Sequence, residues 1–134
     1  DISLCKIYYK GLPTNDERAS LEQTLKLLST YKIERDYEKF LDLSQRLIAD
    51  YPHLTDYLFE ISSVYKELKQ YDKAIAVAER ARLRYPKNYN NLSLLLESYI
   101  SIGNLEKVRV TLDTCLQIKP EDMRLQELKE QFRR

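Results

Sequence analysis

The sequence predicts an all-α fold: an α-solenoid of three antiparallel helix pairs followed by a C-terminal capping helix. The first observation is a proline spacing of 34 residues, at Pro52, Pro86 and Pro120. The second is a tyrosine spacing of the same length, at Tyr31, Tyr65 and Tyr99. The third is composition, because only two glycines and four prolines in 134 residues leave long segments free to be helical. Repeats of this length are supersecondary units that bury their apolar faces by stacking on one another.

The two markers divide the chain into five segments. Residues 1–20 form an N-terminal extension, which we interpret as the end of a preceding helix. The three repeats then occupy 21–54, 55–88 and 89–122, and a capping helix occupies 121–134. Because the chain begins at Asp1 without a methionine, we expect it to be a fragment of a longer protein or a mature form.

Each repeat is predicted to contain two helices. In the middle repeat, apolar residues recur at steps of three and four along the first helix, at Leu58, Ile61, Tyr65 and Leu68. Asp72 is expected to cap the second helix, whose apolar residues are Ala74, Ile75, Ala78 and Ala81. That helix ends before Pro86, because the residue before a proline disfavours helical geometry. We expect the matching turns at residues 34–36 and at Gly103, where glycine suits a left-handed helix stop.

The two ends of the stack are predicted from features other than the repeat. The capping helix is predicted to turn its apolar side chains toward the third repeat, namely Met123, Leu125, Leu128 and Phe132. Its charged residues are expected to face water. Near the other end, residues 11–13 predict a break, and Thr14 with Glu17 matches a capping box that opens the next helix.

The middle repeat resembles the tetratricopeptide repeat family, whose pattern runs aromatic, Leu-Gly, Tyr, Ala, aromatic, Pro. The matching residues are Leu58, Ile61, Ser62, Tyr65, Ala74, Ala78 and Pro86. The chain departs from the pattern where the family has glycine, at Leu28, Ser62 and Leu96. The resemblance covers about residues 21–122 and implies a scaffold that holds an extended peptide or a partner helix in its concave groove.

Little in the sequence suggests catalysis, a cofactor or a metal. The single histidine, His53, offers no nucleophile–base or metal set, and two glycines cannot form a phosphate-binding loop. We interpret Cys5 and Cys115 as small buried apolar residues. The net charge of +1 gives no reason to expect nucleic acid, and no apolar run is long enough to insert into a membrane.

The resemblance also assigns groove positions, because the first helix of each pair lines the inner face in this family. By phase, the predicted partner-binding residues are Leu25, Lys26, Ser29, Asp56, Phe59, Glu60, Ser63, Asn90, Leu94 and Glu97. Lys66 and Ile100 also occupy groove-facing positions of the repeat. The groove is predicted to be mixed and slightly acidic. Phe59 either lies exposed in the groove as an anchor or packs against a neighbouring repeat.

Several functions remain open at this point. Co-chaperone members of the family hold a peptide's carboxylate with a Lys/Asn/Arg set; this chain has Leu25, Ser29, Glu60, Asn90 and Leu94 there, so we exclude that mode. The leading hypothesis is a scaffold for a protein or peptide partner. The alternatives are a structural spacer that self-associates through its N-terminal face, a helical-repeat RNA binder, which lacks the expected basic groove, and an enzyme whose catalytic domain lies elsewhere in a longer protein.

Overall fold

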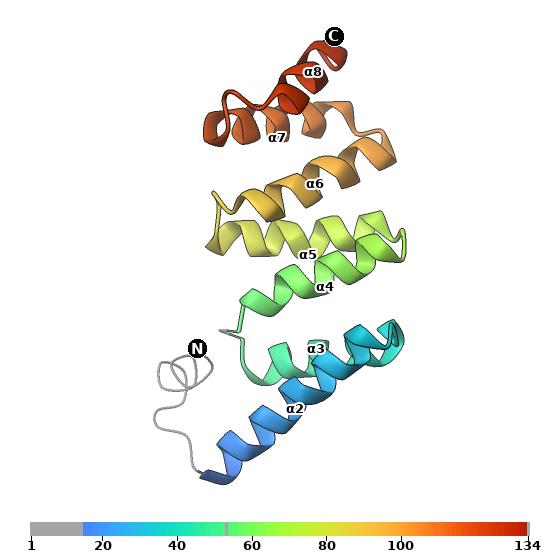
Figure 1. Cartoon of the computed structure of the whole chain (residues 1–134), viewed down its shortest axis with the longest axis vertical. Coiled ribbons are helices and arrows are strands. Elements are labelled where there is room, and N and C mark those ends of the chain that lie inside the picture. Colours follow the sequence, from blue (N-terminus) through green and yellow to red (C-terminus); the bar gives the residue numbers. More distant parts are fainter. Residues whose placement is uncertain (1–14, 53, 134) are drawn as a thin grey trace. The chain divides into compact units, whose positions relative to one another are not determined.

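The computed structural model describes residues 15–52 and 54–133. These residues form seven α-helices and no β-strand, which confirms the all-α prediction (Figure 1). The helices are α2 (Asn15–Ile33), α3 (Tyr37–Asp50), α4 (Asp56–Glu67), α5 (Tyr71–Arg84), α6 (Tyr89–Ile102), α7 (Leu105–Ile118) and α8 (Met123–Gln131). The predictions made for Cys5, residues 11–13, Thr14 and His53 lie outside the described residues.

The chain divides into two compact units, one ending at Tyr57 and the other beginning at Leu58. In the first unit, α2 packs against α3. The buried apolar side chains on these two helices are Leu21, Leu28, Phe40, Leu47 and Ile48. A capping bond secures the start of α3, where the Asp36 carboxylate accepts from the Lys39 amide at 3.4 Å.

The second unit is built from consecutive helices, with α5 packing on α6, α6 on α7 and α7 on α8 (Figure 1). One apolar cluster runs through them and consists of Ala78, Leu92, Leu95, Leu96, Tyr99, Val108, Leu112, Cys115 and Leu125. The part of α4 in this unit buries Leu58, Ile61 and Val64. An all-α solenoid of successive helix pairs is therefore confirmed, and so is the burial of Cys115.

The 34-residue register also appears in the backbone between the two helices of each pair. Three residues in that register have positive φ angles: Arg35 at 59°, Lys69 at 60° and Gly103 at 74°. The amide of the following residue donates in each case to a tyrosine carbonyl, that of Tyr31, Tyr65 or Tyr99, at 2.8 to 3.1 Å. This pairing closes the first helix in the manner of a Schellman motif. The turns predicted at 34–36 and at Gly103 are confirmed.

The second helix of each pair ends in the same way three times. The residues before the three prolines, Tyr51, Tyr85 and Lys119, leave helical geometry with φ near −130°. Their amides still donate back to the carbonyls of Leu47, Ala81 and Cys115. The steric conflict between a proline ring and a helical predecessor accounts for these stops.

The cap predicted at Asp72 is wrong. Helix α5 begins at Tyr71, so its N-cap is Gln70, which makes no side-chain capping bond. The same register position holds Asp36 and Asn104 in the other pairs, and both of these side chains do cap. Glutamine is a poor N-cap because its longer side chain does not match the short reach to the backbone amides. Asp72 instead places its charge in the first turn, where it favours the helix dipole.

Four residues placed in the apolar stripes are more exposed than predicted. Met123 is 73% exposed because it is the first residue of α8, and Leu68 is 39% exposed because it follows the last residue of α4. Leu27, which by its position four residues before Tyr31 corresponds to Ile61 and is expected to be apolar core, is 41% exposed. Its neighbour Leu28 is buried instead, since adjacent helical residues point about 100° apart. Tyr65 is only half-buried. Leu125 is buried, and Leu128 and Phe132 pack against the cluster, as predicted.

Candidate functional site

The predicted partner-binding residues fall on the first helix of each pair. In the unit that ends at Tyr57, Leu25 is half-buried, whereas Lys26, Ser29 and Asp56 are exposed. In the unit that begins at Leu58, Ser63 and Asn90 are exposed. The remaining four are half-buried: Phe59, Glu60, Leu94 and Glu97.

Glu97 connects three helices of the second unit. From α6, one of its carboxylate oxygens accepts from the Lys66 ammonium on α4. The other oxygen accepts from the Arg124 guanidinium on α8 at 3.4 Å. Because a single side chain reaches both neighbours, α4, α6 and α8 present these three residues on one common face. We name this face, with its described residues Ser63, Lys66, Asn90, Glu97 and Arg124, the first-helix face.

The electrostatics of Glu97 follow from this position. Burial by itself would raise the pKa of the carboxyl group, since it disfavours the charged form. The hydrogen bonds and positive charges of Lys66 and Arg124 outweigh burial, and the pKa of Glu97 lies below its ordinary value. The carboxylate is therefore ionised at neutral pH and shares its charge between two cations.

Apolar groups near this face are partly used by the protein itself. The Phe59 ring lies 5.6 Å from the Tyr85 ring, centroid to centroid and tilted by 44°. Phe59 thus packs against the end of α5, within its own predicted repeat. Leu94 packs against the apolar cluster of the second unit. Both side chains keep some exposed surface, which is the usual state of an interface anchor before it binds.

Two contributors were missed by sequence reasoning. Arg124 follows Asn90 by 34 residues, so extending the register into the capping helix would have found it. Tyr89 was also missed: its ring lies under the Lys119 ammonium, 4.0 Å from the ring centroid. Burial, with a contribution from the nearby Cys115 and Asp122, raises the pKa of the Tyr89 phenol. Unlike Arg124, Tyr89 has no signal in the sequence that would have identified it.

The groups on and beside this face are of kinds that can contact a partner. It offers ion pairs, exposed amide and hydroxyl groups, and partly buried apolar side chains. Among residues 15–52 and 54–133, no group of three or more metal-ligating side chains lies close enough together to hold a metal ion. None of the described helices combines the length and apolar character that crossing a membrane would require.

Comparison with known proteins places this geometry among helical repeats. A family model described as tetratricopeptide repeat matches residues 65–132. A solved structure of the type III secretion translocator chaperone SycD from Yersinia enterocolitica, in an alternative dimer, superposes with a TM-score of 0.67. The two are 18% identical, and the alignment covers 89% of this chain and 90% of that chain. At this identity the likeness shows the fold alone. No curated protein matches the sequence.

Proposed function

The chain belongs to the tetratricopeptide repeat family, and on that premise we propose that it binds a peptide or a partner helix on its first-helix face. Members of this family are protein-interaction scaffolds, and that general role applies to this chain. The finer proposal concerns the surface. In the second unit, the partner lies across α4, α6 and α8 and contacts Ser63, Asn90 and Glu97.

The observation that carries this proposal is the double ion pair of Glu97. The bridge from Lys66 to Glu97 to Arg124 joins the first helices α4 and α6 to the capping helix α8 along one face. An aligned row of this kind presents hydrogen-bonding groups at regular intervals, which suits a linear partner. Arg124 is 68% exposed, so an acidic partner group can compete with Glu97 for it.

The remaining predicted positions extend the proposal unit by unit. In the second unit, Phe59, Glu60 and Leu94 flank the row and supply apolar and acidic contacts. In the first unit, Leu25, Lys26 and Ser29 on α2 and Asp56 on α4 are proposed as partner contacts of that unit. SycD is described as a type III secretion translocator chaperone. This description supports a protein partner here more than a nucleic acid.

The alternatives differ in what they predict. A spacer or self-association role predicts that the isolated chain forms oligomers, which a concentration series in light scattering detects. A helical-repeat RNA binder needs a basic groove, whereas this face places a carboxylate at its centre. We propose binding, and not catalysis, as the role of this chain.

Site-specific photo-crosslinking tests the proposal. We would place p-benzoylphenylalanine at Ser63 or Asn90, both exposed on first helices, and at Arg80 or Gln117 as controls on second helices. The expected result in cells of the source organism is a protein adduct from the first pair alone. An adduct sensitive to nuclease would favour RNA. Adducts of equal yield from both pairs, or none from Ser63 and Asn90, would contradict the proposal.

A further inference from the structure

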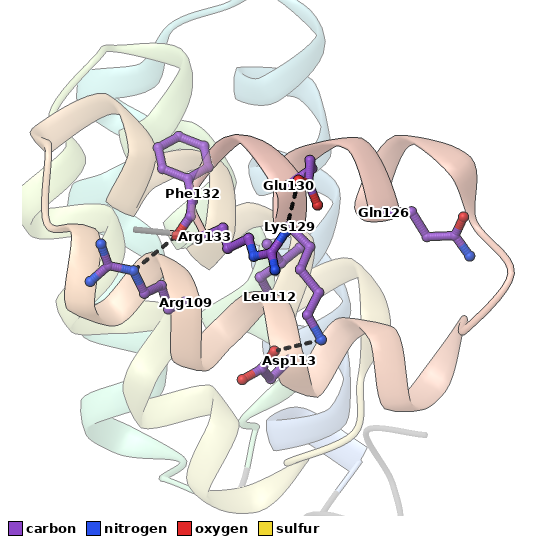
Figure 2. A pocket seen from close by; sticks show the side chains of 8 residues that line it. All are labelled: Arg109, Leu112, Asp113, Gln126, Lys129, Glu130, Phe132 and Arg133. Carbon is purple, nitrogen blue, oxygen red and sulfur yellow. Dashed lines mark hydrogen bonds and ion pairs between the residues drawn. The ribbon is translucent and has the colours of Figure 1, made fainter.

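A cleft of about 450 Å³ lies between α7 and α8, and no residue of the first-helix face lines it (Figure 2). Leu112, which is 2% exposed, and the half-buried Phe132 supply its apolar walls. The other lining residues are polar or charged: Arg109, Asp113, Gln126, Lys129, Glu130 and Arg133. The size is that of a cleft that takes a few side chains of a partner or a small ligand.

The 34-residue register shows which surface of the preceding repeat corresponds to this cleft. Shifting its lining residues back by 34 positions gives Ile75, Ala78, Glu79, Leu92, Leu95, Leu96, Ser98 and Tyr99. All but Glu79 and Ser98 belong to the apolar cluster of the second unit or pack against it. That cluster also contains Val108, Leu112 and Cys115 of α7. The surface between α5 and α6 is therefore completed by α7, and α7 and α8 form the corresponding surface one repeat later.

Comparing residues 34 positions apart shows how the surface formed by α7 and α8 differs from the surface formed by α5 and α6. Leu95, Leu96 and Tyr99 correspond to Lys129, Glu130 and Arg133. Polar residues at these positions suit a surface that meets water when no helix covers it. The apolar residues of the cleft are Leu112 of α7, in register with Ala78, and Phe132 at the end of α8, in register with Ser98 (Figure 2).

The charges of the cleft favour an acidic occupant. Three cations and two carboxylates line it, which leaves a net positive charge. Both carboxylates already have cationic partners, with Asp113 3.8 Å from Lys129 and Glu130 3.1 Å from Arg133. The Arg109 Nε donates to the Phe132 carbonyl at 2.9 Å, which holds the end of α8 beside α7 (Figure 2).

From these observations we propose that the α7–α8 cleft binds an amphipathic helix of a partner protein. This helix takes the place relative to α7 and α8 that α7 takes relative to α5 and α6. Its apolar side chains contact Leu112 and Phe132, and acidic residues on its flanks meet Lys129 and Arg133. The site is separate from the first-helix face, so either can be occupied without the other.

Helix α7 itself provides the probe. We would use a fluorescein-labelled peptide of residues 105–118 with Cys115→Ala, Lys107→Glu and Arg109→Glu, and a matched peptide that keeps Lys107 and Arg109. The expected result in fluorescence anisotropy at low salt is that the acidic peptide binds at least about tenfold more tightly than the matched peptide, whose side-chain charges balance. Added salt weakens this binding, because exposed charges are screened.

Charge reversal in the protein locates the binding. The double variant Lys129→Glu with Arg133→Glu is expected to lower the affinity for the acidic peptide by about tenfold or more. The control Arg80→Glu with Lys107→Glu makes the same charge change on exposed residues outside the cleft, and it is expected to keep the affinity. Amide NMR shifts on addition of peptide should concentrate on α7 and α8.

Four results would overturn the proposal. The first is no saturable binding of the acidic peptide, and the second is equal loss of affinity in the cleft and control variants. The third is self-association of the chain that the cleft variant abolishes, which would make a second copy the occupant. The fourth is a set of NMR shifts on α4 and the exposed side of α6, which would instead place the peptide on the first-helix face. The peptide experiment can be interpreted even if partner binding on the first-helix face is disproved, because the crosslinks that test that proposal are placed on residues outside the cleft.

Discussion

At the scale of single residues, each turn between paired helices contains one residue with left-handed backbone geometry. In only one of the three repeats is that residue a glycine. Gly103 has a φ of 74°, and a Cβ added there would meet no atom within 4 Å. Arg35 and Lys69 hold nearly the same angle with a side chain. For an L-residue this geometry costs about 1–2 kcal/mol. Two of the three turns therefore carry conformational strain that the third avoids.

This difference predicts opposite effects of two substitutions. Gly103→Ala should lower the free energy of unfolding by about 1 kcal/mol, through backbone strain and not through a clash. Lys69→Gly should leave stability unchanged or raise it by up to about 1 kcal/mol, since strain is relieved while unfolded-chain entropy increases. Urea denaturation followed by circular dichroism measures both. Stabilisation by Gly103→Ala would show that the left-handed geometry is not maintained.

The register tyrosines differ in what surrounds them. Tyr99 is 5% exposed, and its hydroxyl donates to Glu79 at 2.6 Å. Burial and this hydrogen bond raise the pKa of Tyr99. Tyr31 and Tyr65 are half-buried, and each ring has a lysine ammonium 5.9 Å from its centroid, from Lys39 and Lys73. The register thus fixes the backbone position of these tyrosines but not their burial.

The more deeply a tyrosine ring is buried, the more stability the protein should lose when that ring is removed. Tyr99→Ala should destabilise the protein by about 3–5 kcal/mol, because it empties a packed site and removes a partner of Glu79. Tyr65→Ala should cost roughly half as much, since its ring is already partly in water. Thermal melts of the two variants at one protein concentration test the order. A larger loss for Tyr65→Ala would contradict the burial described above.

At the scale of helices, the sequence contained most of the information about where elements begin and end. Prolines, a glycine and apolar steps of three and four act locally, so the pairing of α4 with α5 and of α6 with α7 could be predicted. Side chains at helix ends were predicted less well, as Leu68, Asp72 and Met123 show. Their surroundings depend on the residue at which each helix starts or stops, and a shift of one position moves a side chain to another face.

Contacts between helices of different repeats were beyond reach of the sequence. Glu97 was assigned to the groove by its phase, but its partners stand 31 and 27 residues away. Such distances do not follow from a 34-residue repeat alone, because they depend on how each long side chain bends toward its neighbour. The α7–α8 cleft was missed for a related reason: its charged lining resembles an ordinary solvated helix surface.

The ion pairs of Glu97 predict a defined pH dependence. The folded-state pKa of Glu97 is lowered from the ordinary value of 4.5. Its contribution is therefore fully present above that value and is lost as the pH falls through the folded-state pKa. Glu97→Gln should lower the free energy of unfolding by up to about 1 kcal/mol at neutral pH. This difference from the parent should shrink as the pH falls below 4.5 and through the folded-state pKa of Glu97.

Denaturant titrations of the parent and of Glu97→Gln across this pH range provide the measurement. Glu127→Gln on α8 is a suitable control, since this exposed residue is outside the bridge to Lys66 and Arg124. If the difference in free energy of unfolding between the parent and Glu97→Gln grew as the pH fell, it would contradict a stabilising role for the Glu97 ion pairs.

At the scale of the whole molecule, stability comes from contacts between successive helices. The apolar cluster from Ala78 to Leu125 lies entirely within the unit that begins at Leu58. In repeat proteins each element is stabilised mainly by its nearest neighbours. A unit with its own cluster and its own capping helix contains the interactions it needs to fold.

A fragment of residues 55–134 should therefore fold without the preceding residues. The expected result is a helical circular dichroism spectrum and one cooperative thermal transition. The same fragment with Leu95→Ala should lose stability by about 2–5 kcal/mol, because Leu95 is 1% exposed within the cluster. A non-cooperative or largely unfolded fragment would show that the first unit is required.

We propose that this tetratricopeptide repeat protein binds its partner through the helices that come first in each pair and, in the second unit, through α8 as well. Hydrogen–deuterium exchange of the chain, measured alone and with the partner recovered by crosslinking, is the decisive experiment. We expect slower exchange in α4, α6 and α8 of the second unit, with α5 unchanged. Protection confined to α5, or no change in any of the first helices on saturation with partner, would contradict it.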